Sequence, residues 1–121
     1  MIIAIPTNKK NMSALVCPSF GRSQYYMIFD TVTKKKHFIN NPAFESSDGA
    51  GIKAAQKLID EGVKIIITSR YGENASQLLL ASGIKVYKNI DGSLYENIQA
   101  FLNDQLTFLA DIHPGFSQNE E

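Results

Sequence analysis

The chain has 121 residues, of which 44% are hydrophobic and 20% are charged, as in a single ordinary soluble globular domain. Its twelve basic and twelve acidic residues cancel, so neither nucleic acid nor an anionic membrane is favoured as a partner. A lone cysteine, Cys17, excludes an internal disulfide, and no apolar run is long enough for a membrane helix, so we expect a cytoplasmic protein.

Three strands are predicted before the first helix. Residues 2–5 are a short apolar run closed by Pro6, and residues 24–30 are aromatic and β-branched. Residues 34–40 form the third strand, whose three lysines are typical of an exposed sheet edge. The short turn between the second and third strands predicts an antiparallel hairpin.

The second half alternates helices with strands. Helices are predicted over residues 49–61 and 74–82 and from Ser93 onward, where Ser93 and Glu96 have the spacing of a capping box. The first helix should turn Ile52, Ala55, Leu58 and Ile59 inward. Residues 63–68 are a continuous β-branched run, which indicates a strand buried on both faces, and residues 84–87 form another strand. This order predicts a three-layer α/β domain with a mixed five-stranded sheet.

We predict a single domain over residues 1–103 and a C-terminal tail over residues 104–121. The tail contains several large apolar residues, so it should pack either on the core or on a partner. Its last five residues, 117–121, should be disordered.

Three loops are candidates for a binding site. Arg70, Gly72 and Asn74 follow the buried strand, at the end of the sheet where ligands bind in open α/β folds. Gly49 and Gly51 open the preceding helix, where backbone N–H groups can approach an anion. A dinucleotide fingerprint is not indicated, because a loop with a proline separates these glycines from the nearest strand. The remaining interpretations are close backbone packing and an anion site of another kind.

The third loop, residues 17–22, follows the first strand and contains the thiol of Cys17. A single thiol can ligate a soft metal centre or act as a nucleophile, or it can simply be a small core residue. His37 and His113 are not placed to serve as its base, and one cysteine with two scattered histidines cannot close a zinc site. We therefore predict no catalytic residues and a protein that is not an enzyme.

The order and spacing of several short motifs resemble the dinitrogenase iron-molybdenum cofactor biosynthesis domain, the group that includes NifX, NifY and the C-terminal part of NifB. The resemblance covers residues 1–103. The matching motifs are Met1-Ile2-Ile3-Ala4-Ile5-Pro6, Phe20-Gly21-Arg22, Asn41-Pro42, Gly49-Ala50-Gly51 with Ala54-Ala55, Tyr71-Gly72-Glu73-Asn74-Ala75 and Gly83-Ile84-Lys85-Val86-Tyr87. The family implies an RNase H-like motif, with sheet order 3-2-1-4-5 and strand 2 antiparallel to the rest.

The resemblance also implies a carrier or binding protein for iron-sulfur or iron-molybdenum cofactor precursors. Members commonly have a histidine directly before Phe-Gly-Arg, and this chain has Ser19 there. It also lacks the cysteine- and histidine-rich tail of some members, so Cys17 is the one candidate metal ligand.

We predict that a metal cluster or another small anionic ligand binds over the carboxyl ends of the first and fourth strands. The predicted binding residues are Cys17, Ser19, Arg22, Gly49, Gly51, Arg70, Gly72 and Asn74. The alternative is a protein-protein interaction module of the same fold without a metal ligand, acting on a protein partner or as a homodimer.

Overall fold

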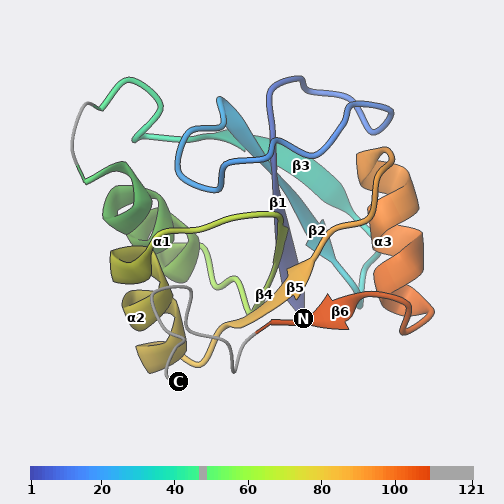
Figure 1. Ribbon diagram of the computed structural model, residues 1–121. Coiled ribbons are helices and arrows are strands. Elements are labelled where there is room, and N and C mark those ends of the chain that lie inside the picture. The colour runs from blue at the N-terminus through green and yellow to red at the C-terminus, as the bar shows by residue number, and fades with distance from the viewer. Residues whose placement is uncertain (47–48, 110–121) are drawn as a thin grey trace.

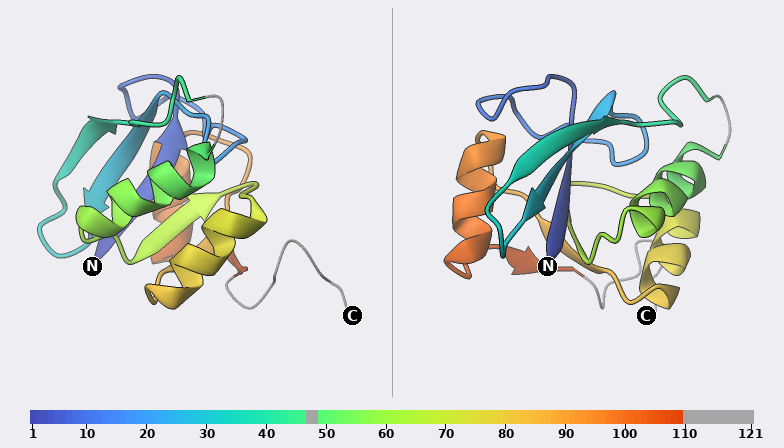
Figure 2. Two further views of the ribbon diagram at one scale, coloured as in Figure 1. Left: turned by 90° about the vertical axis from the view of Figure 1, so that its left-hand side faces the viewer. Right: turned by 180° about the vertical axis from the view of Figure 1, so that it is seen from behind.

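The computed structural model describes residues 1–46 and 49–109, which form three layers around one six-stranded sheet (Figure 1). Helices α1 and α2 cover one face of the sheet and α3 covers the other, as both views of Figure 2 also show. The elements are β1 (Ile2–Thr7), β2 (Tyr25–Asp30), β3 (Lys36–Asn40), α1 (Ala50–Asp60), β4 (Ile65–Thr68), α2 (Glu73–Ala81), β5 (Lys85–Lys88), α3 (Leu94–Leu102) and β6 (Thr107–Phe108).

The strand order is β3-β2-β1-β4-β5-β6. β1 pairs with β2 antiparallel and with β4 in parallel, and Ile3 lies opposite Phe29 on one side and Ile65 on the other. The expected order and the antiparallel second strand are therefore confirmed. Because β1 and β4 run side by side in the same direction, their carboxyl ends open at the same edge of the sheet.

The predicted count of five strands is wrong by one. β6 pairs antiparallel with β5, with Phe108 opposite Tyr87. The strand has only two residues, and it is held by its apolar neighbours: Leu106 packs against the α3 side of the core and Leu109 against the α1 and α2 side. The first part of the predicted tail is thus part of the sheet, while residues 110–121, including the predicted disordered end, lie outside the described residues.

The core has two parts, one on each side of the sheet, and the strands supply both because their side chains alternate. On β4, Ile66 faces α1 and α2, whereas Ile65 and Ile67 face α3, and all three are at most 4% exposed. The prediction of a strand buried on both faces is confirmed. Each such side chain contributes roughly 2 kcal/mol through removal of its apolar surface from water.

The helices agree with the sequence patterns except at one position. Ser93 and Glu96 form the predicted capping box, with each side chain accepting the other residue's backbone N–H at 2.8–3.0 Å. The inward face predicted for α1 is wrong for Ile52, which is 43% exposed, because the helix turns small residues, Ala50, Ala54 and Ala55, toward the sheet. No helix in residues 1–46 and 49–109 has the length and apolarity needed to cross a membrane.

Candidate functional site

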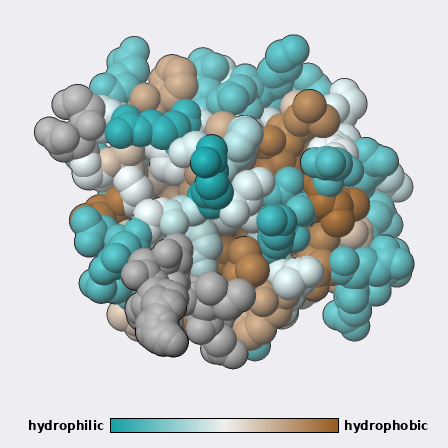
Figure 3. Space-filling view, in the orientation of Figure 1, coloured by the Kyte–Doolittle hydropathy of each residue, from teal (hydrophilic) through white to brown (hydrophobic). Residues whose placement is uncertain are grey.

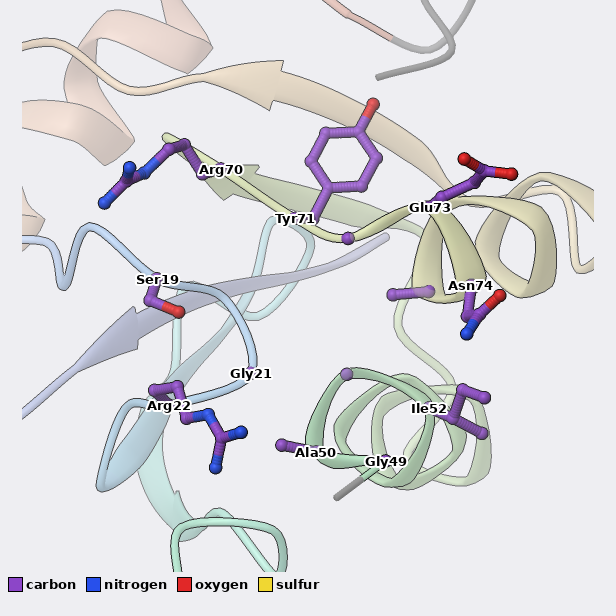
Figure 4. A pocket seen from close by; sticks show the side chains of 13 residues that line it. Ser19, Gly21, Arg22, Gly49, Ala50, Ile52, Arg70, Tyr71, Glu73 and Asn74 are labelled. Carbon is purple, nitrogen blue, oxygen red and sulfur yellow. The ribbon is translucent and has the colours of Figure 1, made fainter. Parts of the chain in front are cut away.

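A cavity of about 580 Å³ opens at the carboxyl ends of β1 and β4, between the starts of α1 and α2 (Figure 4). Seven of the eight predicted binding residues line it, and Cys17 does not. Six further lining residues were not among the predicted ones, and all but Ile52 belong to motifs that the sequence singled out: Gly21, Ala50, Ile52, Tyr71, Glu73 and Ala75. The lining residues are Ser19, Gly21, Arg22, Gly49, Ala50, Gly51, Ile52, Arg70, Tyr71, Gly72, Glu73, Asn74 and Ala75.

The backbone joins the loop after β1 to the loop after β4. Ser19 and Arg70 form an isolated parallel bridge, and the N–H of Phe20 donates to the carbonyl of Arg70 at 3.0 Å. These contacts continue the parallel pairing of β1 and β4 past the ends of both strands. One wall of the cavity is therefore fixed to the other by main-chain hydrogen bonds.

Two glycines bring α1 close to both of its neighbours. A Cβ atom on Gly21 would lie 3.1 Å from the Cα and N atoms of Gly51, and a Cβ atom on Gly51 would lie 3.3 Å from that of Ala75. Glycine is needed where backbones approach this closely. The close-packing interpretation of the glycine loop is therefore confirmed for Gly51 but not for Gly49, which has no neighbour within 4 Å of a Cβ position. The packing at Gly51 places the start of α1 in the cavity wall.

Both helices present their N-termini to the cavity. The N-caps of α1 and α2 are Gly49 and Gly72, which have no side chain to accept a capping hydrogen bond. The first turns of both helices therefore lack the bond that a serine, threonine, aspartate or asparagine N-cap would supply, and both helix dipoles place partial positive charge here. The arrangement favours an anion.

The charged side chains add to this potential. Arg22 and Arg70 line the cavity, and among the described residues Glu73 is the only acidic one that does. In Figure 4 the Arg22 guanidinium reaches toward the start of α1, whereas Arg70 extends along the rim, away from Glu73. Arg22 also donates to the carbonyl of Ser46, so it has a structural role besides its charge.

Cys17 lies outside the lining. Its thiol is buried, 7% exposed, and donates to the carbonyl of Ser19 at 3.6 Å. Among the described residues there is no cluster of three or more histidine, cysteine, aspartate or glutamate side chains able to hold a metal ion. Metal ligation by Cys17 stays a prediction, while the cavity itself offers N–H and guanidinium donors.

Two buried side chains hold the Phe20-Gly21-Arg22 segment from below. The Tyr26 hydroxyl donates to the carbonyl of Phe20, and the two rings lie 5.6 Å apart. The Asn41 side chain donates to the carbonyls of Gly21 and Ser23 at 3.2 and 2.8 Å. The sequence placed Asn41 only at the end of a hairpin, because nothing local shows which carbonyls its amide will meet.

Burial raises the pKa of the Tyr26 phenol above its ordinary value of 10.0. The folded protein therefore keeps this proton at a pH where the unfolded chain loses it. The contribution of the neutral Tyr26 phenol to the free energy of unfolding is complete below pH 10 and is lost as the pH rises above it. We expect the free energy of unfolding of the wild type to fall, relative to a Tyr26→Phe variant, by about 1.4 kcal/mol between about pH 9 and pH 11. Urea unfolding of both proteins across this pH range measures the difference in their free energies of unfolding. A difference that does not change with pH would contradict the prediction.

Residues 1–104 match the family described as "Dinitrogenase iron-molybdenum cofactor". An uncharacterised protein of Methanocaldococcus jannaschii is 33% identical over 109 residues, which cover 88% of this chain and 89% of that protein. Among solved structures, the apo form of the orange protein from Desulfovibrio gigas has a TM-score of 0.83 and 33% identity, covering 88% of this chain and 91% of that one. A candidate NifB protein from Thermotoga has a TM-score of 0.81 and 33% identity, covering 98% and 97%.

Proposed function

The chain belongs to the dinitrogenase iron-molybdenum cofactor family, and we propose that it is a non-enzymatic carrier of an anionic metal-sulfur cluster or cofactor precursor. The family and its relatives support a cofactor-related carrier or accessory role. One similar structure, the orange protein, was solved in an apo form, a term for a protein without the group that it binds. The cargo in our proposal is an iron-sulfur or iron-molybdenum cluster bound in the cavity between α1 and α2.

The observation that carries the proposal is the meeting of two helix N-termini, both with a glycine as N-cap residue, at one cavity of about 580 Å³. Iron-sulfur and molybdenum-sulfur clusters commonly carry net negative charge, and their sulfur atoms accept hydrogen bonds from N–H groups. Ser19, Arg22, Gly49, Gly51, Arg70, Gly72 and Asn74 would surround such a cluster. Hydrogen bonds and charge, without a metal-protein bond, suit a cargo that must be released again.

The lining also argues against catalysis. Among the described lining residues Glu73 is the one carboxylate and there is no histidine, so these residues offer no pair of side chains for general acid-base chemistry. The alternative of an interaction module without a metal ligand would use the exposed edge strand β3, where Lys36 and His37 face solvent. The two functions differ in whether the purified protein takes up metal.

Anaerobic reconstitution with iron and sulfide, followed by gel filtration and metal analysis, tests the carrier function. We expect iron and sulfide to elute with the protein and to give visible absorbance, and a colourless, metal-free protein would contradict the proposal. An Asn74→Asp variant sharpens the test. The substitution places a carboxylate in the first turn of α2. There it should interact favourably with the helix dipole and stabilise the helix, but it should repel an anionic cargo.

We expect Asn74→Asp to bind the cluster about tenfold more weakly while the protein unfolds at an unchanged or higher urea concentration. Gln77→Glu is the matched control, because it makes the same change of charge on an exposed position of α2 that does not line the cavity. Titration of both variants with the preformed cluster gives the two affinities. Equal affinities would show that the helix start does not contact the cargo.

A further inference from the structure

We propose that a second cavity, between α3 and the β2-β3 hairpin, binds a small amphiphilic anion with an apolar body and a carboxylate head. The cavity has a volume of about 420 Å³ and lies beside the sheet face that α3 covers. Figure 2, in the view from behind, shows the hairpin next to α3. The proposal does not rest on the carrier function, because no residue lines both cavities.

The body of the cavity is apolar. Phe29 and Ile98 form its buried part, while Tyr95 and Leu102 stand at its mouth with 57% and 40% of their surfaces exposed. Met12 completes the wall. Figure 3 shows hydrophobic residues among hydrophilic ones on the side of the molecule that carries α3 in Figure 1. A concave, mostly apolar surface with a few polar groups is the usual form of a small-molecule site.

The walls are fixed by the backbone. The N–H of Tyr95 donates to the carbonyl of Met12 at 3.0 Å, which ties the loop after β1 to the start of α3. Lys36 lies opposite Phe29 in the β2-β3 ladder, so it projects from the same face of the sheet. The N–H of Lys34 donates to the carbonyl of Asp30 at 2.8 Å in the turn that joins the two strands. These contacts fix the loop after β1, the start of α3 and the hairpin turn around the cavity.

The charge on the rim has one sign. Lys34 and Lys36 line the cavity together with Gln99, and no acidic residue among those that the structure describes does so. Among the described residues neither lysine forms an ion pair, since the single salt bridge there joins Lys57 to Glu61. Two unpaired ammonium groups beside an apolar surface are complementary to a molecule with a carboxylate at one end. The volume suits a body of about ten heavy atoms and is too small for a folded partner.

The experiment is a titration of the isotope-labelled protein with 4-phenylbutanoate and with the neutral 4-phenylbutanamide, followed by two-dimensional NMR. We expect saturable shifts of the amides of Lys36, Ile98 and Leu102, with a Kd of about a millimolar for the carboxylate, as befits a twelve-atom ligand. The amide compound should bind about fivefold more weakly, because it cannot pair with the lysines.

A double variant, Lys34→Gln with Lys36→Gln, should bind both compounds equally, at the affinity of the neutral one. Its control, Lys64→Gln with Lys85→Gln, makes the same change of net charge at exposed lysines outside the cavity and should keep the preference for the carboxylate. Equal binding of the two compounds to the wild type, or shifts elsewhere, would overturn the proposal. So would shifts of these amides with protein concentration alone, since the surface would then be an interface between two copies.

Discussion

A Gly21→Val variant is expected to be less stable than the wild type by about 3 kcal/mol, a typical cost for forcing extra atoms into a packed interior. The reason is that the Cβ atom would lie 3.1 Å from two main-chain atoms of Gly51 and 3.3 Å from the main chain of Ala50. Backbone atoms at the start of a helix cannot move aside as the end of a flexible side chain can. Guanidinium unfolding, followed by circular dichroism, measures the change.

Gly72→Ala is the matched control for this prediction. Gly72 lines the same cavity and also begins a helix, but a Cβ atom there would have no neighbour within 4 Å. Its φ of −76° is open to every residue, so the substitution should cost no more than about 1 kcal/mol, the preference of an N-cap for glycine over alanine. If Gly21→Val were as stable as Gly72→Ala, the close approach of the Phe20-Gly21-Arg22 segment to α1 would be wrong.

An Asn41→Ala variant should also lose about 3 kcal/mol of stability. The side chain is 4% exposed, donates to the carbonyls of Gly21 and Ser23, and accepts the N–H of Ala43 at 2.9 Å. Alanine would leave these main-chain groups buried without partners. Each unsatisfied group costs about 1–3 kcal/mol, and relaxation of the surrounding chain offsets part of the sum. The segment that carries Arg22 would loosen, so cluster binding should weaken together with stability.

The neighbouring residue provides the comparison. Asn40 has the same side chain but is exposed on the edge strand β3, and replacing it by alanine should change stability by less than about 0.5 kcal/mol. Urea unfolding of the two alanine variants under the same conditions measures both effects. Equal midpoints would mean that the amide of Asn41 does not support the cavity wall.

The sequence predicted those parts of the fold whose cause is local. The β-branched run of β4 has no reasonable alternative to a strand buried on both faces, and the capping box at Ser93 and Glu96 depends on a spacing of three residues. β6 was missed for the opposite reason. Thr107 and Phe108 are too few to show the alternation of apolar and polar residues that marks a strand. They form a strand only because β5 has an unpaired edge and because Leu106 and Leu109 anchor the chain on both sides.

The candidate site was predictable as a set of loops but not as a shape. Polar and glycine residues after strands and before helices indicate the end of the sheet where ligands bind, and this placed Ser19, Gly49 and Asn74 correctly around one cavity. The contact of Gly21 with Gly51 depends on how α1 crosses the sheet, and Cys17 is turned inward by the hydrogen bond of its N–H to the carbonyl of Pro6. Neither fact is local in the sequence.

The parallel pairing of β1 with β4 also determines when the cavity comes into existence. Ile3 meets Ile65, so forming this ladder closes a loop of roughly sixty residues before any hydrogen bond between the two strands is gained. Contacts so distant in the chain form late in folding and slow it. On the ribosome, the three lining segments cannot assemble until Ala75 has left the exit tunnel, so the cavity is open to a ligand only after that point of synthesis.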